Sequence, residues 1–413
     1  MLPPAPRYES LDACRGAACL MVVAAHATMF GSHAAGADDG SAAGWAVAAC
    51  ARLVVGVPLF FVISGYCIAA AADATRGRGG SVGGYFARRV RRIYPPYAAA
   101  VGLTAAAAVL LPGLLTGDFG PIAPVPDPLA LAPARWAAGL TLTETWRPLY
   151  DPARPALFVL GPAWTLCYEE QFYAVAGSIL LVAPRRFFLG CLVVTGVVAA
   201  GAAGRWGGLP VTGTFLDGRW LMFAAGVGVY YARNRAGRAG RAGVVAGLLA
   251  GIGWAGWRTE GLTDFRFYDP IADPKELVPA FAFALALLAA RRWDRVAAGS
   301  AAGRVLGGVG RYSYSLYLVH YPICLALGHA AFRAGLTDPR ATLFLVLPAA
   351  VALSVVAARR FYRVVESRFL SAPGSAGPAG HRPRAKSPSV ARAGPGELDI
   401  VHPKAITSYK CSP

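Results

Sequence analysis

The sequence predicts an all-α integral membrane protein, a polytopic bundle of about ten transmembrane helices with both termini in the cytoplasm. Three observations lead to this fold class: the composition is apolar, apolar runs recur along the chain, and arginines gather in alternate loops. Of the 413 residues, 56% are hydrophobic and 15% are charged, with a mean hydropathy of +0.46. Soluble domains carry about a quarter charged residues, so this composition is typical of a membrane protein.

Apolar runs of membrane length extend from near the N-terminus almost to residue 360. They cover residues 14–31, 45–71, 94–112, 157–183, 187–203, 213–231, 243–257, 277–290, 305–331 and 341–358. A helix of about 20 apolar residues crosses the hydrocarbon core of a bilayer. We therefore expect each run to contain one membrane-spanning helix.

The charges between these runs predict how the helices are oriented. One set of loops holds Arg76, Arg78, Arg88, Arg89, Arg91, Arg92, Arg185, Arg186, Arg233, Arg235, Arg238, Arg241, Arg291, Arg292, Arg295 and Arg304. The alternate loops are mixed or acidic and hold Asp38, Asp39, Asp118, Asp127, Glu144, Asp151, Glu260, Asp264, Asp269, Asp273 and Glu276. Because arginine marks the cytoplasmic side, an even number of spans with both termini inside fits every loop.

The composition divides the chain into a membrane domain, residues 1–370, and a tail, residues 371–413. The tail is rich in Pro, Gly, Ser and Arg and has no apolar periodicity, which predicts a disordered cytoplasmic segment. The net charge of +18 does not indicate a nucleic-acid partner, since the basic residues form short clusters between apolar runs. The eight cysteines show no metal-ligand spacing, so we expect no metal site.

The first apolar run carries two ionisable side chains, Arg15 and His26. Such residues are costly inside a bilayer and usually face a bundle interior or a water-filled cavity where they have a function. Eleven residues of helix rise roughly 16 Å, about half of the hydrocarbon thickness. The spacing therefore predicts a fixed positive charge near the cytoplasmic face and a titratable imidazole deeper in the membrane.

Six segments, in order along residues 10–370, together resemble one protein family. They are LDACRGAACLMVVAAHA (11–27), PLFFVISGYCI (58–68), ARRVRRIYPPY (87–97), PAWTLCYEEQFY (162–173), GRYSYSLYLVHYP (310–322) and FYRVVESRF (361–369). The set resembles the membrane acyltransferase-3 family, the integral-membrane acyl-CoA-dependent O-acyltransferases. In that family's first-span signature an arginine is followed, after ten residues, by a histidine, and Arg15 and His26 match it.

A cluster of four arginines precedes the third apolar run. Its members are Arg88, Arg89, Arg91 and Arg92. One interpretation is a cytoplasmic membrane anchor. The other is a phosphate-binding role together with Arg15, because arginine pairs bidentately with phosphate and coenzyme A carries several phosphates. Pro95 and Pro96 follow at once, and we expect them in the first turn of the third helix.

Two adjacent carboxylates, Glu169 and Glu170, lie in the fourth apolar run, after Trp164. We expect them at about the depth of His26, where one carboxylate orients the imidazole and stabilises its protonated form. Neighbouring helix positions point about 100° apart, so at most one can face His26 directly. We favour Glu170, because it falls on one helical stripe with Leu166 and Tyr173. The alternative is that both carboxylates lie in interfacial water.

His320 lies in the middle of the ninth run and follows a series of tyrosines and serines. We expect His320 and Tyr317, with Trp164 and Ser64, to line the binding site of the acceptor. The alternative is structural, since hydroxyl groups at helical spacing often join helices in membranes, and Ser64 with Gly65 permits close helix packing. A nucleophilic Ser64 is a further alternative, although no base adjoins it in the sequence.

The resemblance implies a reaction as well as a fold. A short acyl group would pass from cytoplasmic acyl-CoA, a co-substrate and not a permanently bound cofactor, to a hydroxyl group. The acceptor would be a glycan, a lipid-linked saccharide or a glycosylated, macrolide-like metabolite, and the protein would lie in a bacterial plasma membrane. His26 would act as general base or as an acyl-carrying nucleophile.

A proton-coupled transporter is the alternative from a different functional class. It too would place His, Arg and Glu side chains within its spans. However, the sequence contains no repeated pair of Gly/Pro-broken segments of the kind that marks inverted repeats.

Overall fold

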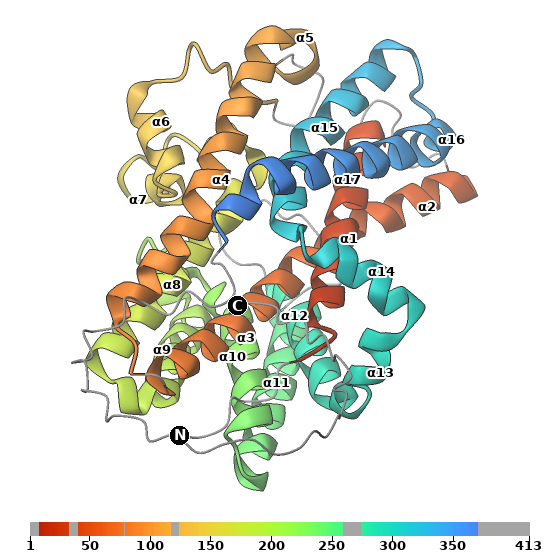
Figure 1. The fold of residues 1–413 in the computed structure, drawn as a ribbon. Coiled ribbons are helices and arrows are strands. Elements are labelled where there is room, and N and C mark those ends of the chain that lie inside the picture. Colours follow the sequence, from red (N-terminus) through yellow and green to blue (C-terminus); the bar gives the residue numbers. More distant parts are fainter. Residues whose placement is uncertain (1–7, 33–39, 78, 117–123, 259–273, 371–413) are drawn as a thin grey trace, which may run out of the picture. The chain divides into compact units, whose positions relative to one another are not determined.

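The computed structural model describes residues 8–32, 40–77, 79–116, 124–258 and 274–370, and these residues form helices and no strand (Figure 1). The predicted tail, residues 371–413, lies outside the described residues. The long helices are α1 (Leu11–Ser32), α3 (Gly56–Gly77), α4 (Val82–Leu110), α8 (Trp164–Val182), α9 (Phe187–Ala203), α10 (Trp220–Asn234), α11 (Arg238–Arg258), α12 (Pro274–Ala289), α15 (Ser313–Arg333) and α17 (Leu347–Val364). The short helices are α2 (Ala42–Ala51), α5 (Pro112–Leu115), α6 (Pro133–Leu140), α7 (Arg147–Tyr150), α13 (Asp294–Gly299), α14 (Ala301–Gly310) and α16 (Pro339–Ala341).

The predicted fold class is confirmed, because the apolar runs contain long helices of membrane composition. Seven helical segments in the described part of the chain are long and apolar enough to cross a membrane. They are Leu11–Gly31, Ala42–Gly77, Val82–Leu110, Pro184–Ala203, Arg238–Arg258, Ser313–Arg333 and Pro339–Arg368. The runs at 157–183, 213–231 and 277–290 form α8, α10 and α12, which are not among the seven. The count of about ten spans and the cytoplasmic termini stay predictions.

The prediction that Pro95 and Pro96 open the third helix is wrong. Helix α4 begins at Val82, where the side chain of Ser81 accepts a hydrogen bond from the backbone N–H of Gly84 at 3.0 Å. The two prolines lie inside the helix. Because proline has no N–H group, Pro95 and Pro96 leave the carbonyls of Arg91 and Arg92 without their usual helical donors. The same turn of α4 is joined to α15, where the Tyr314 hydroxyl donates to the Ile93 carbonyl at 2.9 Å.

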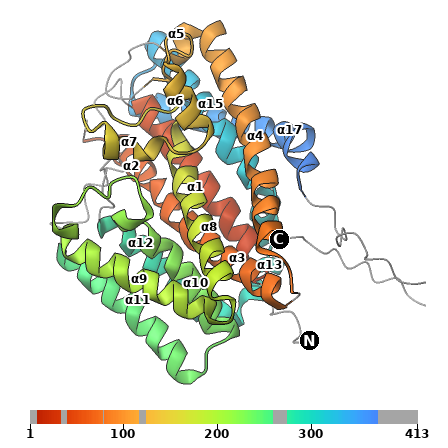
Figure 2. The same cartoon turned by 90° about the vertical axis from the view of Figure 1, so that its left-hand side faces the viewer.

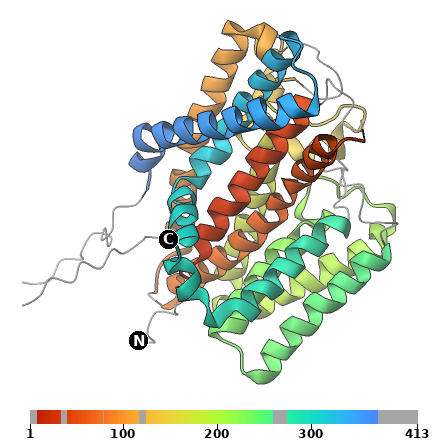
Figure 3. The ribbon, with the colours of Figure 1, turned by 90° about the vertical axis from the view of Figure 1, so that its right-hand side faces the viewer.

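Helix α1 packs against α3, α14, α15 and α17, so Arg15 and His26 lie within the bundle. Figure 3 shows α17 crossing α15. Helices α9 to α12 pack together and meet the other helices through α3 and α8 (Figure 2).

Two glycine contacts permit the closest helix crossings. A Cβ atom at Gly16 would overlap the carbonyl oxygen of Leu306 in α14, and one at Gly65 would overlap that of Phe223 in α10. Small residues at such crossings let backbones approach in membranes. The predicted packing role of Gly65 is therefore confirmed, and Gly16 fixes the position of α1 beside the segment that leads into α15.

Candidate active site

The structure brings the two intramembrane histidines together. The Nε2 atom of His320 lies 3.3 Å from the Nδ1 atom of His26, and their ring centroids are 5.2 Å apart. Phe30 and Tyr321 flank the His26 ring, with centroids 5.7 and 5.4 Å away. His26 is half-buried, whereas His320 is only 1% exposed. His26 therefore has surface left for a further contact, while His320 has almost none.

This burial changes the expected role of His320. The sequence predicted that His320 lines the acceptor site, but a side chain without exposed surface offers nothing for an acceptor to contact. Its neighbour on the same helix, Tyr317, is half-buried. The Tyr317 hydroxyl lies 2.9 Å from the Thr165 hydroxyl and also donates to the Pro162 carbonyl. Tyr317 thus joins α15 to the start of α8.

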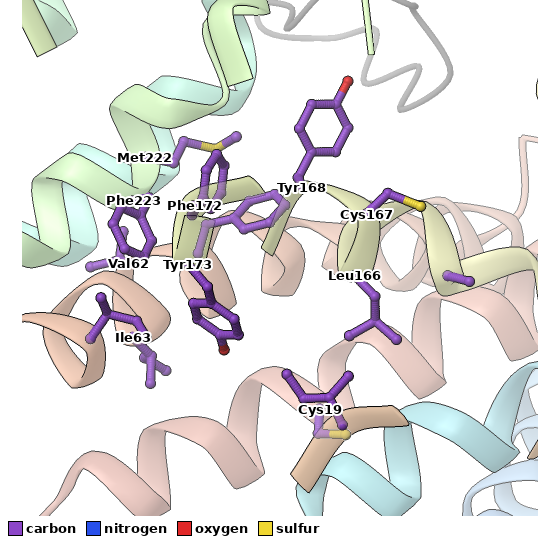
Figure 4. Packing of buried hydrophobic residues seen from close by; sticks show 14 of the residues in the cluster. Cys19, Val62, Ile63, Leu166, Cys167, Tyr168, Phe172, Tyr173, Met222 and Phe223 are labelled. Atoms are coloured by element: carbon purple, nitrogen blue, oxygen red, sulfur yellow. The ribbon is translucent and has the colours of Figure 1, made fainter. Parts of the chain in front are cut away.

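Glu169 lies in a polar cluster between α3 and α8. Its Oε1 atom accepts two hydrogen bonds, one from the Ser64 hydroxyl at 2.7 Å and one from the Tyr173 hydroxyl. Figure 4 shows Tyr173 on the side of α8 that faces Cys19 of α1, while Phe172 lies against Met222 and Phe223. Ser64 therefore binds a carboxylate, which accounts for its polar side chain without a nucleophilic role.

Glu170 faces α4, where Arg89 is its electrostatic neighbour. Within the described residues, its Oε1 atom is buried and has no hydrogen-bond partner. The contacts of His26 in the described part of the chain are with His320, Phe30, Tyr321 and the carbonyl of Val22, and neither carboxylate is among them. The predicted carboxylate–imidazole pair is thus not formed. Helix α15 places His320, and not a carboxylate, beside His26. The helical stripe that favoured Glu170 therefore does not identify a partner of His26.

Arg15 lies at the opposite end of the same polar region from His26. Its guanidinium donates to the Asp12 carboxylate and to the Cys67 sulfur, each at 2.8 Å. It also interacts electrostatically with Tyr173, which places Arg15 next to the Glu169 cluster. Half-buried polar side chains from α1, α3, α8 and α15 gather in this region; they are Arg15, Ser64, Cys67, Glu169, Tyr314, Tyr317 and His26. Glu169 interacts electrostatically with Tyr314 and Tyr317, and the Tyr317 ring lies beside that of His320, so the group extends from Arg15 to the histidine pair.

The four arginines of α4 point in different directions. Arg88 reaches Thr75 of α3 at 3.5 Å, Arg91 is exposed, and Arg92 interacts electrostatically with Glu366. Only Arg89 turns toward the Glu169 cluster, where its guanidinium lies 5.1 Å from the centre of the Tyr173 ring. The cluster predicted as one phosphate-binding group is therefore divided: Arg89 and Arg92 are half-buried and face different carboxylates, and Arg89 alone of the four lies beside the Glu169 cluster.

Trp164 packs against a buried charged group. The Arg219 guanidinium lies 5.3 Å from the centre of the Trp164 ring and pairs with Asp217 at 2.9 Å. The Tyr168 ring lies 6.0 Å from that of Trp164. One face of Trp164 thus serves helix packing, although its half-buried ring leaves the predicted acceptor contact open to test.

Two buried carboxylates hold the helices that carry the histidines. Asp294 accepts hydrogen bonds from the backbone N–H groups of Glu9 and Ser10 at 3.0 and 2.9 Å, at the start of α1. Glu366 accepts from the backbone N–H of Ser315 at 3.0 Å, at the start of α15. Carboxylates at helix N-termini satisfy free N–H groups and oppose the helix dipole. These two contacts fix the rotation and height of α1 and α15.

Several residues of this region were not predicted. Tyr173 follows Glu169 by one helical turn, and that spacing is a usable signal for a contact. Cys67 and Thr165 carry no such signal, because their partners lie on other helices. Among the described residues, no group of three or more His, Cys, Asp or Glu side chains could hold a metal ion.

The comparison with protein families decides what kind of protein this is. A family model described as an acyltransferase domain matches residues 8–359, most of the chain. The chain belongs to the acyltransferase-3 family. It is also 32% identical over 174 residues to a curated protein of Rhizobium radiobacter named protein 2 in picA locus, and the aligned part covers 42% of this chain and 82% of that protein. No solved structure matches it.

Membership in the acyltransferase-3 family confirms the resemblance drawn from the six motifs. Together with the apolar helices, it makes the protein a multi-pass membrane acyltransferase. The histidine pair, the Glu169 cluster, Arg15 and Arg89 lie inside the matched range. The sixth motif, residues 361–369, lies beyond that range, yet it supplies the Glu366 contact to α15.

Proposed function

We propose that this membrane acyltransferase moves a short acyl group from acyl-CoA to a hydroxyl group of a saccharide or a glycosylated small molecule. The observation that carries the proposal is the half-buried His26, backed by a buried partner and reached from Arg15 through half-buried polar side chains. An imidazole in such a place suits proton transfer to and from a reacting hydroxyl.

The donor would dock at the arginine-rich end of the bundle. Arg15 and Arg89 both adjoin Tyr173, so two guanidinium groups from different helices converge on one side of the polar region. Guanidinium groups bind phosphate bidentately. The flexible pantetheine arm of acyl-CoA would extend from there toward His26, which lies roughly 16 Å farther along α1.

The chemical step needs one atom that acts first as a base and then as an acid. His26 would take the proton from the acceptor hydroxyl as its oxygen attacks the thioester carbonyl, and the carbon–sulfur bond would then break. His26 would return the proton to the departing thiolate, so the products are an ester and free coenzyme A. The rival mechanism passes the acyl group through an acyl-histidine at the same residue.

The acceptor would approach beside the middle of α4, one to three turns from the arginines. Tyr97, Arg135, Trp136 and Phe158 are among the residues that line a small hollow there, which has a cavity volume of about 10 Å³, so an acceptor would have to move these side chains apart. Tyr97 interacts electrostatically with Tyr314 and Tyr317, which connects the hollow to the polar region. The arginine-rich loops and the bacterial relative support a bacterial plasma membrane as its location.

Transfer by the purified protein tests the proposed function. The protein would be reconstituted in liposomes with acyl-CoA carrying a labelled acyl group outside and a panel of hydroxyl acceptors inside. We expect a labelled ester and free coenzyme A in equal amounts. Label crossing the membrane without ester formation would instead support the transporter alternative.

Arg15→Ala is expected to raise the KM for acyl-CoA by about 10- to 100-fold, since a charge-assisted hydrogen bond contributes about 1.5–3 kcal/mol. Arg15→Lys should have a smaller effect, because lysine keeps the charge but loses the planar fork. Titration of acyl-CoA with both variants measures the difference. Equal affinity of the Arg15→Ala variant and the unaltered protein would reject a donor-binding role.

Arg89→Ala is expected to weaken acyl-CoA binding more than Arg91→Ala, its matched control on the same helix. Arg89 faces Tyr173 inside the bundle, whereas the exposed charge of Arg91 is screened by solvent and salt. We expect about a 10-fold rise in KM for Arg89→Ala and at most about 3-fold for Arg91→Ala. Equal effects would mean that the whole cluster acts as a surface charge.

A further inference from the structure

The hydrogen bonds around the two histidines define which ring nitrogens carry protons. The Nδ1 atom of His320 lies 2.8 Å from the Tyr317 carbonyl and 3.0 Å from the Leu316 carbonyl. Carbonyl oxygens only accept hydrogen bonds, so this nitrogen must carry a proton and donate it. A neutral imidazole holds one N–H, and the Nε2 atom of His320 is therefore an acceptor.

The same reasoning applies to His26. Its Nδ1 atom lies 3.0 Å from the Val22 carbonyl and 3.3 Å from the Nε2 atom of His320. Both neighbours are acceptors, so Nδ1 of His26 must carry the proton. The Nε2 atom of His26 is then left with a lone pair. In the described part of the chain it makes no hydrogen bond, on a side chain that is half-buried.

We propose that His320 is a positioning residue that holds His26 in the Nδ1–H form and thereby makes Nε2 of His26 the reactive atom. His320 would do for His26 what a carboxylate does for the histidine of a Ser-His-Asp triad. Together with the Val22 carbonyl it fixes the tautomer, and it fixes the ring orientation from a second helix, without touching the substrate. The inference rests on the proposed function, and it assigns to His320 the orienting part of the role that the sequence assigned to Glu169 or Glu170.

The opposite tautomers are disfavoured by the same contacts. A proton on Nε2 of His320 in a neutral ring would leave the Nδ1 lone pair facing two carbonyl oxygens. A doubly protonated His320 would donate to Nδ1 of His26, whose lone pair would then also face the Val22 carbonyl. Unpaired or opposed polar groups of this kind are costly where water is excluded.

The surrounding helices keep His320 in place. Glu366 and Ser315, both buried, fix the first turn of α15, one and a half turns before His320. Tyr317 packs beside His320, with ring centroids 6.3 Å apart. The Nε2 atom of His320 therefore meets His26 at a set height and angle.

The proton balance of the proposed step follows. The acceptor hydroxyl gives its proton to Nε2 of His26 as its oxygen bonds to the acyl carbon. The imidazolium keeps its Nδ1 proton, which it donates to His320 and to the Val22 carbonyl. When the carbon–sulfur bond breaks, Nε2 returns its proton to the sulfur of coenzyme A, and both histidines regain their starting forms.

Two substitutions at His320 separate positioning from structure. In His320→Gln the amide oxygen reaches the place of Nε2 and can accept from His26, whereas in His320→Asn the shorter amide reaches only the place of Nδ1. We expect His320→Asn to lower kcat by about 100-fold, with KM unchanged for both substrates. His320→Gln should stay within about 10-fold of the unaltered kcat. Equal loss in the two variants would overturn the positioning role.

A spectroscopic measurement checks the tautomer without any turnover. The ¹⁵N spectrum of the histidine-labelled protein distinguishes Nδ1–H from Nε2–H rings, and the His26 signal is identified by its absence in His26→Ala. We expect the Nδ1–H form in the unaltered protein and in His320→Gln, and a mixture in His320→Asn. An Nε2–H signal for His26 in the unaltered protein would contradict the proposal. If His26→Ala retains turnover, it is the proposed function that fails instead.

Discussion

We expect His26→Ala to abolish acyl transfer while the protein still inserts into membranes and purifies as a single species. General acid–base catalysis by one side chain contributes about 100- to 10,000-fold, and a nucleophilic histidine would contribute at least as much. Initial rates with labelled acyl-CoA at saturating acceptor measure the loss. Near-normal turnover would reject both mechanisms together.

A matched control comes from a second histidine of α15. His329 lies near the other end of that helix, where its ring contacts the Leu114 carbonyl at 2.6 Å. His329→Gln also removes an imidazole from a membrane helix, but at a distance from the histidine pair. We expect it to keep most of the activity, so that a loss in His26→Ala can be assigned to the site.

The two mechanisms at His26 predict different products when acceptor is left out. An acyl-histidine would form in the absence of acceptor, release coenzyme A in an initial burst and leave labelled acyl on the protein. A general base would release coenzyme A only when a hydroxyl is supplied. Rapid mixing of protein and labelled acyl-CoA without acceptor therefore separates them.

The sequence predicted the fold class and the separation of Arg15 and His26, because both depend on local composition and on the rise of one helix. It could not predict the partner of His26. His320 lies 294 residues away, and its meeting with His26 depends on how α1 and α15 are aligned. That alignment follows from the close approach at Gly16 and from the contacts of Asp294 and Glu366 at the two helix starts.

The arginine cluster illustrates a second limit. Four arginines within five residues look equivalent in a sequence, yet successive helix positions turn by about 100° and send them to different neighbours. Which of the four arginines face inward depends on the rotation of α4 about its own axis. That rotation is set by packing against α8 and α15, which no local pattern reports.

The same limit applies to Glu169 and Glu170, and here we expect unequal effects. Glu169 is bonded to Ser64 and Tyr173 and interacts electrostatically with Tyr314 and Tyr317, which lead to the histidine pair. On the side that faces α4, the positive charge of Arg89 offsets the negative charge of Glu170. The helical stripe in the sequence favoured Glu170 as the carboxylate that acts on His26, whereas the contacts in the structure favour Glu169.

Glu169→Gln is expected to lower kcat by about 10- to 100-fold, and Glu170→Gln by at most about 3-fold. Glutamine keeps an oxygen that can accept from Ser64 and Tyr173, so the variant removes the charge and leaves the helix contact. The lost charge would otherwise favour the positive imidazolium that forms on His26 during proton transfer. Steady-state kinetics of the two variants, with thermal unfolding as a check on folding, measures the difference. Equal and mild losses would mean that both carboxylates have a purely structural role. The two side chains lie on different faces of α8, so a charge effect on the histidine pair must differ between them.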